Sequence, residues 1–429
     1  MKIVRLGRPR RIEKYLDLVA NDDVELLTVF SREEEKDRLS LELMNARFDC
    51  NDLVKKIRIL PEPLLKSYER SWKRIQLEKL MRTTLGMKSH ETDRKRWRER
   101  ARKIQPHLER ADLIWFGDSD LDNPCEWLVA VADLQVNVPK ILSLKETRYK
   151  RKYFEEMALN VADGVIFPHE GYLGFIKSLY GTVPANVEWA DPNYPASHLT
   201  NWLREQAVEK MSTVDGRPHA CILTRSLMGE SGKTSPRSGA RYYMLDEVQD
   251  LMDAGMVVHL HAAGKGDDGA IPREYLELEE KTESFVIERP LTLIAGSSDY
   301  LTLAKYDFGV LHPSTVNASK GLRKFQEINV PNRYFEYLAV GLNVLVRKGS
   351  LRWLEESVSA HGGGLVWSNA DDLKGQLVGW LSNSTSSDCP APCGSNYRVY
   401  AESLQRCYRN IPAGQENYMR RHEATADAT

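Results

Sequence analysis

Residues 330 to 346 have the sequence Val330-Pro-Asn-Arg-Tyr-Phe-Glu-Tyr-Leu-Ala-Val-Gly-Leu-Asn-Val-Leu-Val346. Asn332 is a suitable N-cap for a short helix, and Gly341 suits the left-handed residue that ends one. The apolar face of that helix would consist of Tyr334, Phe335, Leu338 and Ala339. A strand from Asn343 to Val346 follows almost at once. The stretch therefore predicts a short helix joined tightly to a buried strand.

A short helix that opens toward the carboxyl edge of a parallel sheet is a natural anion site, because its N–H groups and dipole favour phosphate. We expect Asn332 and Arg333 at this helix start to hold a diphosphate, with Tyr334 lining the same site. Glu336 lies about one turn further along, where its carboxylate can accept two ribose hydroxyls. A lone Glu on a helix usually faces solvent. The role predicted for Glu336 therefore depends on the whole stretch, which is far more specific than this one residue.

The segments on both sides of this stretch repeat one pattern, a short apolar strand followed by a turn and an amphipathic helix. Such alternation predicts right-handed βαβ units and parallel sheets. The first series of predicted strands is Lys2–Leu6, Val24–Phe30, Lys56–Leu60, Asp112–Phe116, Lys140–Leu144 and Gly164–Phe167. The second series is His219–Thr224, Val257–His261, Ser284–Ile287, Phe308–His312, Asn343–Arg347 and Gly364–Trp367.

The chain has 429 residues, which suits two or three domains rather than one. Between the two strand series lies Glu188-Trp-Ala-Asp-Pro-Asn-Tyr-Pro-Ala-Ser197, where we place the domain boundary. The expected organisation is an α/β protein with two Rossmann-like domains, 1–195 and 196–395, whose parallel sheets face across a cleft. Residues 396–429 are expected to form a late amphipathic helix followed by a disordered tail.

The stretch from Pro331 to Val344 resembles the block P-N-K-x-F-E-Y-L-A-x-G-x-P-V in the C-terminal domain of a large group of GT-B glycosyltransferases. The resemblance covers roughly residues 160 to 385 and is specific around 331 to 346. It implies a donor domain in which Arg225, at the end of a strand, and Lys233 also hold the donor diphosphate. It also implies a nucleotide-sugar donor, transfer of hexosyl type, and departure of the diphosphate without a metal ion or cofactor. By the same resemblance, the helix within residues 396–429 is expected to pack back on the first domain.

The chain departs from this group at several positions. Retaining members often carry two glutamates eight residues apart, and the position eight before Glu336 is Ile328. Asn343 replaces the common Pro. The segment Gly229-Glu-Ser-Gly-Lys-Thr234 is not a P-loop, because the position that needs the first glycine is Leu227.

Two loops in the first half carry groups suited to general base catalysis. Asp118-Ser-Asp120 follows a predicted strand, and Pro168-His169 follows the last strand of that half. Asp118, Asp120 or His169 would take the proton of an acceptor hydroxyl if the enzyme inverts. The Asp pair also matches the DxD metal motif of GT-A enzymes, and a helix cap is an equally good interpretation. His169 has an unexceptional loop histidine as its alternative.

Residues 66 to 110 hold 15 Lys plus Arg against 6 Asp plus Glu. Their spacing predicts one or two long helices. A solvated helical face is the plain interpretation, and an anionic membrane surface or a nucleic acid are the functional ones. Composition alone does not choose between them.

The remaining composition is that of an ordinary globular protein, with 42% hydrophobic residues and a net charge of -1. No apolar segment is long enough for a membrane span or a signal peptide. Cys50, Cys125, Cys221 and Cys407 stand alone and are expected to be buried thiols, and Cys389–Cys393 a loop. A cytoplasmic protein, with peripheral contact to a membrane as an option, is the expectation.

The sequence thus predicts a glycosyltransferase that moves a sugar from a nucleotide donor to a glycan, lipid-linked or nucleic-acid acceptor. Three alternatives stay open. These are a sugar-nucleotide epimerase of related fold, a nucleic-acid-binding or modifying protein that uses the basic segment, and a sugar-nucleotide-binding protein without catalytic activity.

Overall fold

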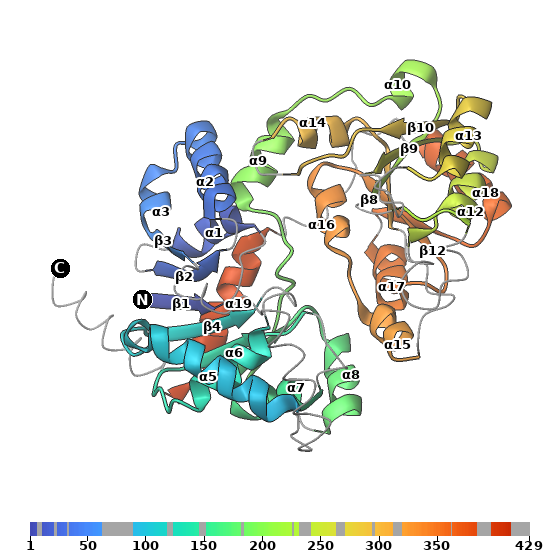
Figure 1. The fold of residues 1–429 in the computed structure, drawn as a ribbon. Helices are drawn as coiled ribbons and strands as arrows, with labels where there is room; N and C mark the ends of the chain where they lie inside the picture. The colour runs from blue at the N-terminus through green and yellow to red at the C-terminus, as the bar shows by residue number, and fades with distance from the viewer. Residues whose placement is uncertain are drawn as a thin grey trace. The chain divides into compact units, whose positions relative to one another are not determined.

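The computed structural model describes residues 1–6, 11–20, 24–31, 34–61, 89–117, 123–145, 152–181, 184–224, 227–230, 242–262, 271–293, 297–311, 320–361, 363–383 and 396–412. The chain forms two compact units (Figure 1). Unit 1 comprises Met1–Ser197 with Asn396–Thr429, and unit 2 comprises His198–Ser395.

Unit 1 is built on a parallel seven-stranded sheet with the order β3-β2-β1-β4-β5-β6-β7. The central strands are buried on both faces, which explains their nearly continuous apolar sequences. The strands are β1 (Lys2–Leu6), β2 (Glu25–Ser31), β3 (Ile57–Pro61), β4 (Leu113–Gly117), β5 (Lys140–Ser143), β6 (Gly164–Phe167) and β7 (Val187–Trp189).

Helices connect these strands, and the last helix of the chain returns to unit 1. They are η1 (Ile12–Lys14), α1 (Tyr15–Val19), α2 (Glu34–Phe48), α3 (Asn51–Lys55), α5 (Ser89–Leu108), α6 (Pro124–Ala132), α7 (Lys152–Val161), α8 (Gly171–Tyr180) and α19 (Tyr397–Arg409). The helix α19 packs against α1 and strands β5 to β7 (Figure 1). Tyr397 and Tyr400 of α19 are fully buried there, and Tyr15 of α1 lies beside Tyr397.

Unit 2 has a parallel six-stranded sheet with the order β10-β9-β8-β11-β12-β13. Numbered within the unit, this is the 3-2-1-4-5-6 order of a Rossmann fold. The strands are β8 (His219–Thr224), β9 (Val257–Ala262), β10 (Phe285–Glu288), β11 (Phe308–Leu311), β12 (Asn343–Arg347) and β13 (Gly364–Trp367).

The two faces of this sheet differ in chemistry. One face, with residues such as Ile222, Leu260 and Val310, forms an apolar core with α12 (Leu245–Asp253), α13 (Arg273–Lys281) and α18 (Ala370–Asn383). The other face carries His219, Cys221, His259 and His261. The remaining helices are α9 (Ser197–Glu205), α10 (Ser212–Asp215), α14 (Asp299–Ala304), α15 (Lys320–Ile328), α16 (Asn332–Ala339) and α17 (Arg352–His361).

The predicted fold class of two parallel α/β sheets is confirmed, and each predicted strand is present with ends shifted by no more than a residue or two. One strand was missed. The segment Val187–Trp189 is the edge strand β7, although its sequence was assigned to a linker. Its three half-exposed residues give no apolar run, so only pairing with β6 defines it.

Candidate functional site

The centre of unit 2 contains the point where the strand order reverses, between β8 and β11. These strands pair at only two positions, Phe308 with Ala220 and Gly309 with Cys221, and then diverge. The hydroxyl of Tyr337, from α16, lies in the gap that follows. It accepts from the backbone N–H of Leu223 and donates to the carbonyl of Val310, both at 3.4 Å. In open parallel sheets, ligands bind beyond the carboxyl ends of strands at such a reversal.

Packing at Gly309 holds α16 close to this point. A Cβ built on Gly309 would lie 2.3 Å from ring carbons of Tyr337. The ring therefore occupies the space that any larger residue of β11 would need, and Tyr337 is fully buried. A glycine inside a strand marks such a close approach.

The direction of α16 follows from contacts at its two ends. Its carboxyl end lies near the start of β11, because Lys210 Nζ donates to both Tyr306 O at 2.7 Å and Gly341 O at 3.3 Å. Tyr337, one turn earlier, lies beside Val310, the third residue of β11. The start of α16, at Asn332 and Arg333, is therefore directed toward the carboxyl edge of the sheet.

The ends of α16 differ slightly from the predicted ones. The N-cap residue is Pro331 rather than Asn332, and the side chain of Pro331 makes no capping hydrogen bond. Pro331 has the extended φ and ψ of an N-cap residue, so the helix itself begins at Asn332. The carboxyl end is as expected, since Gly341 adopts a φ of +74° and Leu342 N donates to Tyr337 O.

The predicted apolar face of α16 is partly wrong. Phe335 and Tyr337 are the buried residues, whereas Tyr334, Leu338 and Ala339 are half-buried. Tyr337 is absent from the predicted face, yet it is fully buried and the sheet satisfies its hydroxyl. Arg333 and Glu336 are also half-buried.

Of the predicted donor residues, four lie together on α16, namely Asn332, Arg333, Tyr334 and Glu336. The other two, Arg225 and Lys233, lie outside the described residues.

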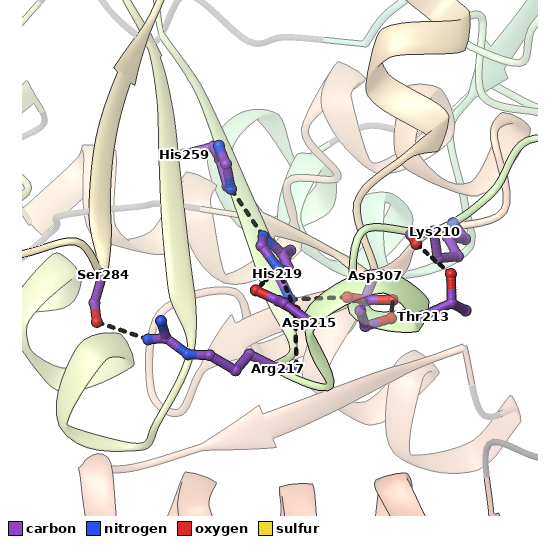
Figure 2. A network of polar contacts seen from close by, with 9 residues as sticks. Lys210, Thr213, Asp215, Arg217, His219, His259, Ser284 and Asp307 are labelled. Carbon is purple, nitrogen blue, oxygen red and sulfur yellow. Dashed lines mark hydrogen bonds and ion pairs between the residues drawn. The ribbon is translucent and has the colours of Figure 1, made fainter.

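The opposite, amino edge of the sheet carries a network of polar contacts (Figure 2). Asp307 accepts from the backbone N–H of His219 at 2.8 Å and from the hydroxyl of Ser212 at 2.5 Å. Arg217 donates to Ser284 Oγ at 2.7 Å, so the network reaches the start of β10. These contacts tie α10 and the strand starts together, at the edge away from the nucleotide position of such sheets.

Two histidines extend this network into the sheet (Figure 2). His219 Nε2 lies 3.0 Å from Asp215 Oδ2, and His219 Nδ1 lies 2.9 Å from His259 Nε2. His259 Nδ1 is 3.4 Å from Glu288 Oε1. Burial lowers the pKa of His259 to about 4, and His219 beside it acts in the same direction. The long contact to the more exposed Glu288 does not offset that cost, so His259 is neutral near pH 7.

The neighbouring His261 has a defined tautomer. Its Nδ1 lies 2.8 Å from the carbonyl of Arg289, which can only accept, so Nδ1 carries the proton. Its Nε2 then accepts from the hydroxyl of Tyr306 at 2.8 Å. Burial lowers the pKa of His261 and raises that of Tyr306, which favours the neutral form of both.

In unit 1, three polar residues follow neighbouring strands at the carboxyl edge. Lys145 comes two residues after β5, His169 two after β6, and Asp191 two after β7. Lys145 Nζ lies 3.3 Å from Asp191 Oδ1 and both side chains are buried, so this lysine is engaged within the protein. His169 is half-buried with its ring edge-on to Tyr172, at 5.0 Å between centroids. Tyr172 in turn donates to the carbonyl of Lys145 at 2.5 Å.

The loop with Asp118 and Asp120 lies outside the described residues, but its starting point is defined. Gly117 ends β4 with a φ of +114°. A Cβ there would lie 2.3 Å from the carbonyl oxygen of Ser143 on β5. Only glycine fits both conditions, so the direction in which the chain leaves β4 depends on it.

The described part of the basic segment is the helix α5. It buries Trp97, Ala101, Ile104 and Leu108 at helical spacing. Arg94 forms two hydrogen bonds to Asp133, from Nε at 2.7 Å and from Nη2 at 2.5 Å. Arg96 pairs with Asp93, and Arg100 lies over the ring of Trp97. Much of the positive charge is thus engaged within unit 1, while Lys95, Arg102 and Lys103 are exposed.

The lone cysteines behave as predicted, because Cys50, Cys125, Cys221 and Cys407 are all buried free thiols. Among the residues that the structure describes, no three His, Cys, Asp or Glu side chains are grouped so as to hold a metal ion. Within the same part of the chain, no helix combines the length and the apolar character that crossing a membrane requires. The segment Cys389–Cys393 lies outside the described residues.

Comparison with family models and with curated proteins gives no match. Among solved structures, the chain is similar to Anabaena HepE in complex with UDP, with 13% identity, a TM-score of 0.50, and 99% of this chain and 100% of that chain covered. The UDP-forming alpha,alpha-trehalose-phosphate synthase of Burkholderia vietnamiensis has 12% identity and a TM-score of 0.49, with 99% and 100% covered. The UDP-GlcNAc 2-epimerase of Methanocaldococcus jannaschii has 9% identity and a TM-score of 0.49, with 95% and 100% covered.

The likeness to HepE concerns the fold, which is the two-unit α/β architecture called GT-B. Within this fold, the contact between Tyr337 and Gly309 is the feature that the sequence analysis missed. Its signals were a glycine inside a buried strand and a tyrosine within the helix of the 331–344 block. Together they fix the helix whose start is the candidate anion site.

Proposed function

We propose that the protein is a glycosyltransferase that takes a sugar from a nucleotide-sugar donor bound by unit 2. The observation that carries this proposal is the position of α16. Its start, at Asn332, is directed toward the carboxyl edge at the β8/β11 reversal, and Tyr337 holds it there. A helix start at this position is suited to a diphosphate. The complex of HepE with UDP supports uridine nucleotides as the first donors to test.

In the proposed reaction, the bond between the donor sugar C1 and the diphosphate oxygen breaks, and a bond from C1 to an acceptor oxygen forms. The departing diphosphate gains negative charge, which the α16 start and the Arg333 guanidinium would stabilise. Glu336 would accept from the ribose hydroxyls and so orient the nucleotide. Arg225 and Lys233 are proposed as further diphosphate ligands.

The acceptor hydroxyl loses its proton in this reaction, and a base must receive it. His169, Asp118 and Asp120 are the proposed candidates. His169 has a fixed ring beside Tyr172, which favours a defined direction for its nitrogens. The proposed acceptors are a glycan, a lipid-linked sugar or a nucleic acid, and the proposed location is the cytoplasm, with peripheral attachment to a membrane as an option.

The first test is thermal stabilisation by UDP, GDP, ADP, CDP, dTDP and their common sugar conjugates. A ligand at a hundred times its dissociation constant adds about 2.7 kcal/mol, which a melting curve detects. We expect one nucleotide series to stabilise the wild type, with the effect strongly reduced in Arg333→Ala and Glu336→Ala. Arg352→Ala and Glu356→Gln are matched controls, because these residues form an exposed pair at 3.1 Å on α17.

Equal stabilisation of all variants would place the nucleotide elsewhere and contradict the donor site. Products formed from the stabilising sugar nucleotide then separate the reaction classes. Release of the nucleoside diphosphate with slow transfer of the sugar to water is expected of a transferase without its acceptor. An epimerised sugar, free or still attached to its nucleotide, would instead support the epimerase alternative.

A further inference from the structure

The chain passes between the two units twice, after Ser197 and before Asn396. A sequence with two prolines and polar residues, such as Asp191-Pro-Asn-Tyr-Pro195, is typical of a linker at a domain boundary. In the structure Asp191 and Asn193 of this segment are buried, as are Ala196 and Ser197 directly after it. The first connection is therefore an ordered part of unit 1 up to the residue at which it leaves.

Side chains of unit 1 hold this connection at several positions. Lys145 Nζ lies 3.3 Å from Asp191 Oδ1, as described above. Lys14 Nζ donates to the carbonyl of Pro192 at 3.0 Å. Asp17 Oδ2 accepts from the backbone N–H of Ser197 at 2.7 Å, and its Oδ1 accepts from the Ser197 hydroxyl. Ser197 is the first residue of α9, so Asp17 supplies a carboxylate to a helix start.

The second connection returns at the same place. Tyr397 N donates to the carbonyl of Pro195 at 2.9 Å, which joins the two connections directly. Asn396 caps α19 by accepting from Arg398 N at 3.0 Å. Arg398 Nε lies 4.0 Å from Asp17 Oδ1, and the Asp17 side chain has an exposed fraction of 0%. One carboxylate is thus the neighbour of both connections.

We propose that Asp17 is a positioning residue that holds both connections at one place on unit 1. The first connection is then held on unit 1 as far as Ser197, and the chain is held there again from Asn396 onward. A buried carboxylate with a backbone N–H, a hydroxyl and a nearby guanidinium as neighbours is costly to replace, because its removal leaves those donors without an acceptor.

The test is hydrogen exchange by mass spectrometry on the full chain carrying Asp17→Ala. We expect exchange to rise by at least tenfold in the peptides that contain residues 197–200 and 396–399, at both places together. Strands β4, β5 and β6 should keep their protection. Asp299→Ala is the matched control, because this buried carboxylate of unit 2 also accepts a backbone N–H, from Thr292 at 2.6 Å, and pairs with Arg289.

Asp17→Asn and Ser197→Ala are milder variants, which keep the proposal testable if Asp17→Ala fails to fold. Each keeps part of the contact, so we expect smaller rises in exchange at the same two places. A rise confined to residues 197–200 would overturn the proposal, because Asp17 would then be only a helix cap. A rise throughout unit 1 would overturn it as well, because Asp17 would then be a general core residue. The outcome is independent of the donor site, since the nucleotide-induced thermal shift should be unchanged by Asp17→Asn.

Discussion

The ring of Tyr337 rests on the α-carbon of Gly309, and its hydroxyl bridges Leu223 and Val310 where β8 and β11 separate. This one side chain thereby fixes both the distance of α16 from the sheet and the direction of the helix. The candidate donor site depends on this contact, since Arg333 and Glu336 are carried by the same short helix.

Gly309→Ala should displace α16. The new Cβ would lie 2.3 Å from the Tyr337 ring, and such overpacking costs about 1–3 kcal/mol. In a unit of this size we expect the melting temperature to fall by roughly 2–4 °C per kcal/mol. Nucleotide-induced stabilisation should fall with it. Differential scanning calorimetry with and without the nucleotide measures both effects.

Gly375→Ala provides the control within unit 2. Gly375 lies in α18, and a Cβ there meets nothing within 4 Å. Alanine should therefore stabilise the helix by about 0.5–1 kcal/mol. If Gly309→Ala is as harmless as Gly375→Ala, the close approach of Tyr337 does not constrain α16.

Tyr337→Phe separates the ring from the hydroxyl. The ring packing should persist, while Leu223 N and Val310 O lose a shared partner. Because both hydrogen bonds are long, at 3.4 Å, we expect a cost of about 1 kcal/mol rather than several. Amide exchange of Leu223 should accelerate with little change elsewhere in β8. Unchanged exchange at Leu223 would contradict a role for the hydroxyl in closing this gap.

The parts of the fold that sequence could predict are those with local signals. Buried parallel strands are short apolar runs, so both sheets could be predicted strand by strand, whereas β7 has no such run. The start and end of α16 were predicted to within one residue, from Asn332 and Gly341. Residues far apart in the chain gave no such signal. Asp17 and Ser197 are 180 positions apart, and His219 and His259 are 40 apart.

The candidate site also has residues that the sequence could predict and contacts that it could not. Arg333 and Glu336 could be named from the sequence because one helix holds them at a fixed spacing. The partners of Lys145 could not, since its pairing with Asp191 requires β5 and β7 to be positioned by β6 between them. Topology, rather than local pattern, decides which polar residues at a sheet edge are engaged.

The stability of unit 2 should decrease in acid because of His259. The pKa of His259 in the folded unit is about 4, below the usual 6.5. Between these two pH values the unfolded chain binds a proton at this histidine and the folded unit does not. Stability is therefore complete above about pH 6.5 and declines as the pH falls toward 4, by at most about 3 kcal/mol. Urea midpoints between pH 4.5 and 7.5 measure this dependence.

His259→Gln should flatten that dependence, because glutamine can still donate toward His219 but does not titrate. His107→Gln is the control, since His107 is exposed on α5. An identical pH dependence in wild type and His259→Gln would assign the acid sensitivity to other groups, His261 among them.

The basic helix α5 makes a separate prediction about anionic partners. The side chains of Lys95, Arg102 and Lys103 are exposed on this helix. Arg94 and Arg96 are engaged with Asp133 and Asp93. If α5 binds double-stranded DNA, replacing all three by alanine should reduce the slope of log K against log salt by about 3. An unchanged slope would show that α5 is a solvated face, and vesicles of anionic lipid test the membrane alternative with the same variant.

Gly117→Ala tests whether the loop after β4 takes part in the reaction. The substitution combines a left-handed φ of +114° with a clash against the carbonyl of Ser143, so the chain must leave β4 in another direction. If Asp118 or Asp120 is the base, kcat should fall by roughly 10²–10⁴, the usual contribution of general base catalysis. The nucleotide-induced thermal shift should be retained, because the proposed donor site lies in unit 2. Asp118→Asn and Asp120→Asn identify the carboxylate without moving the chain. If all three variants keep the wild-type kcat while His169→Gln loses it, the base is His169, and the glycine serves only the packing of β4 against β5.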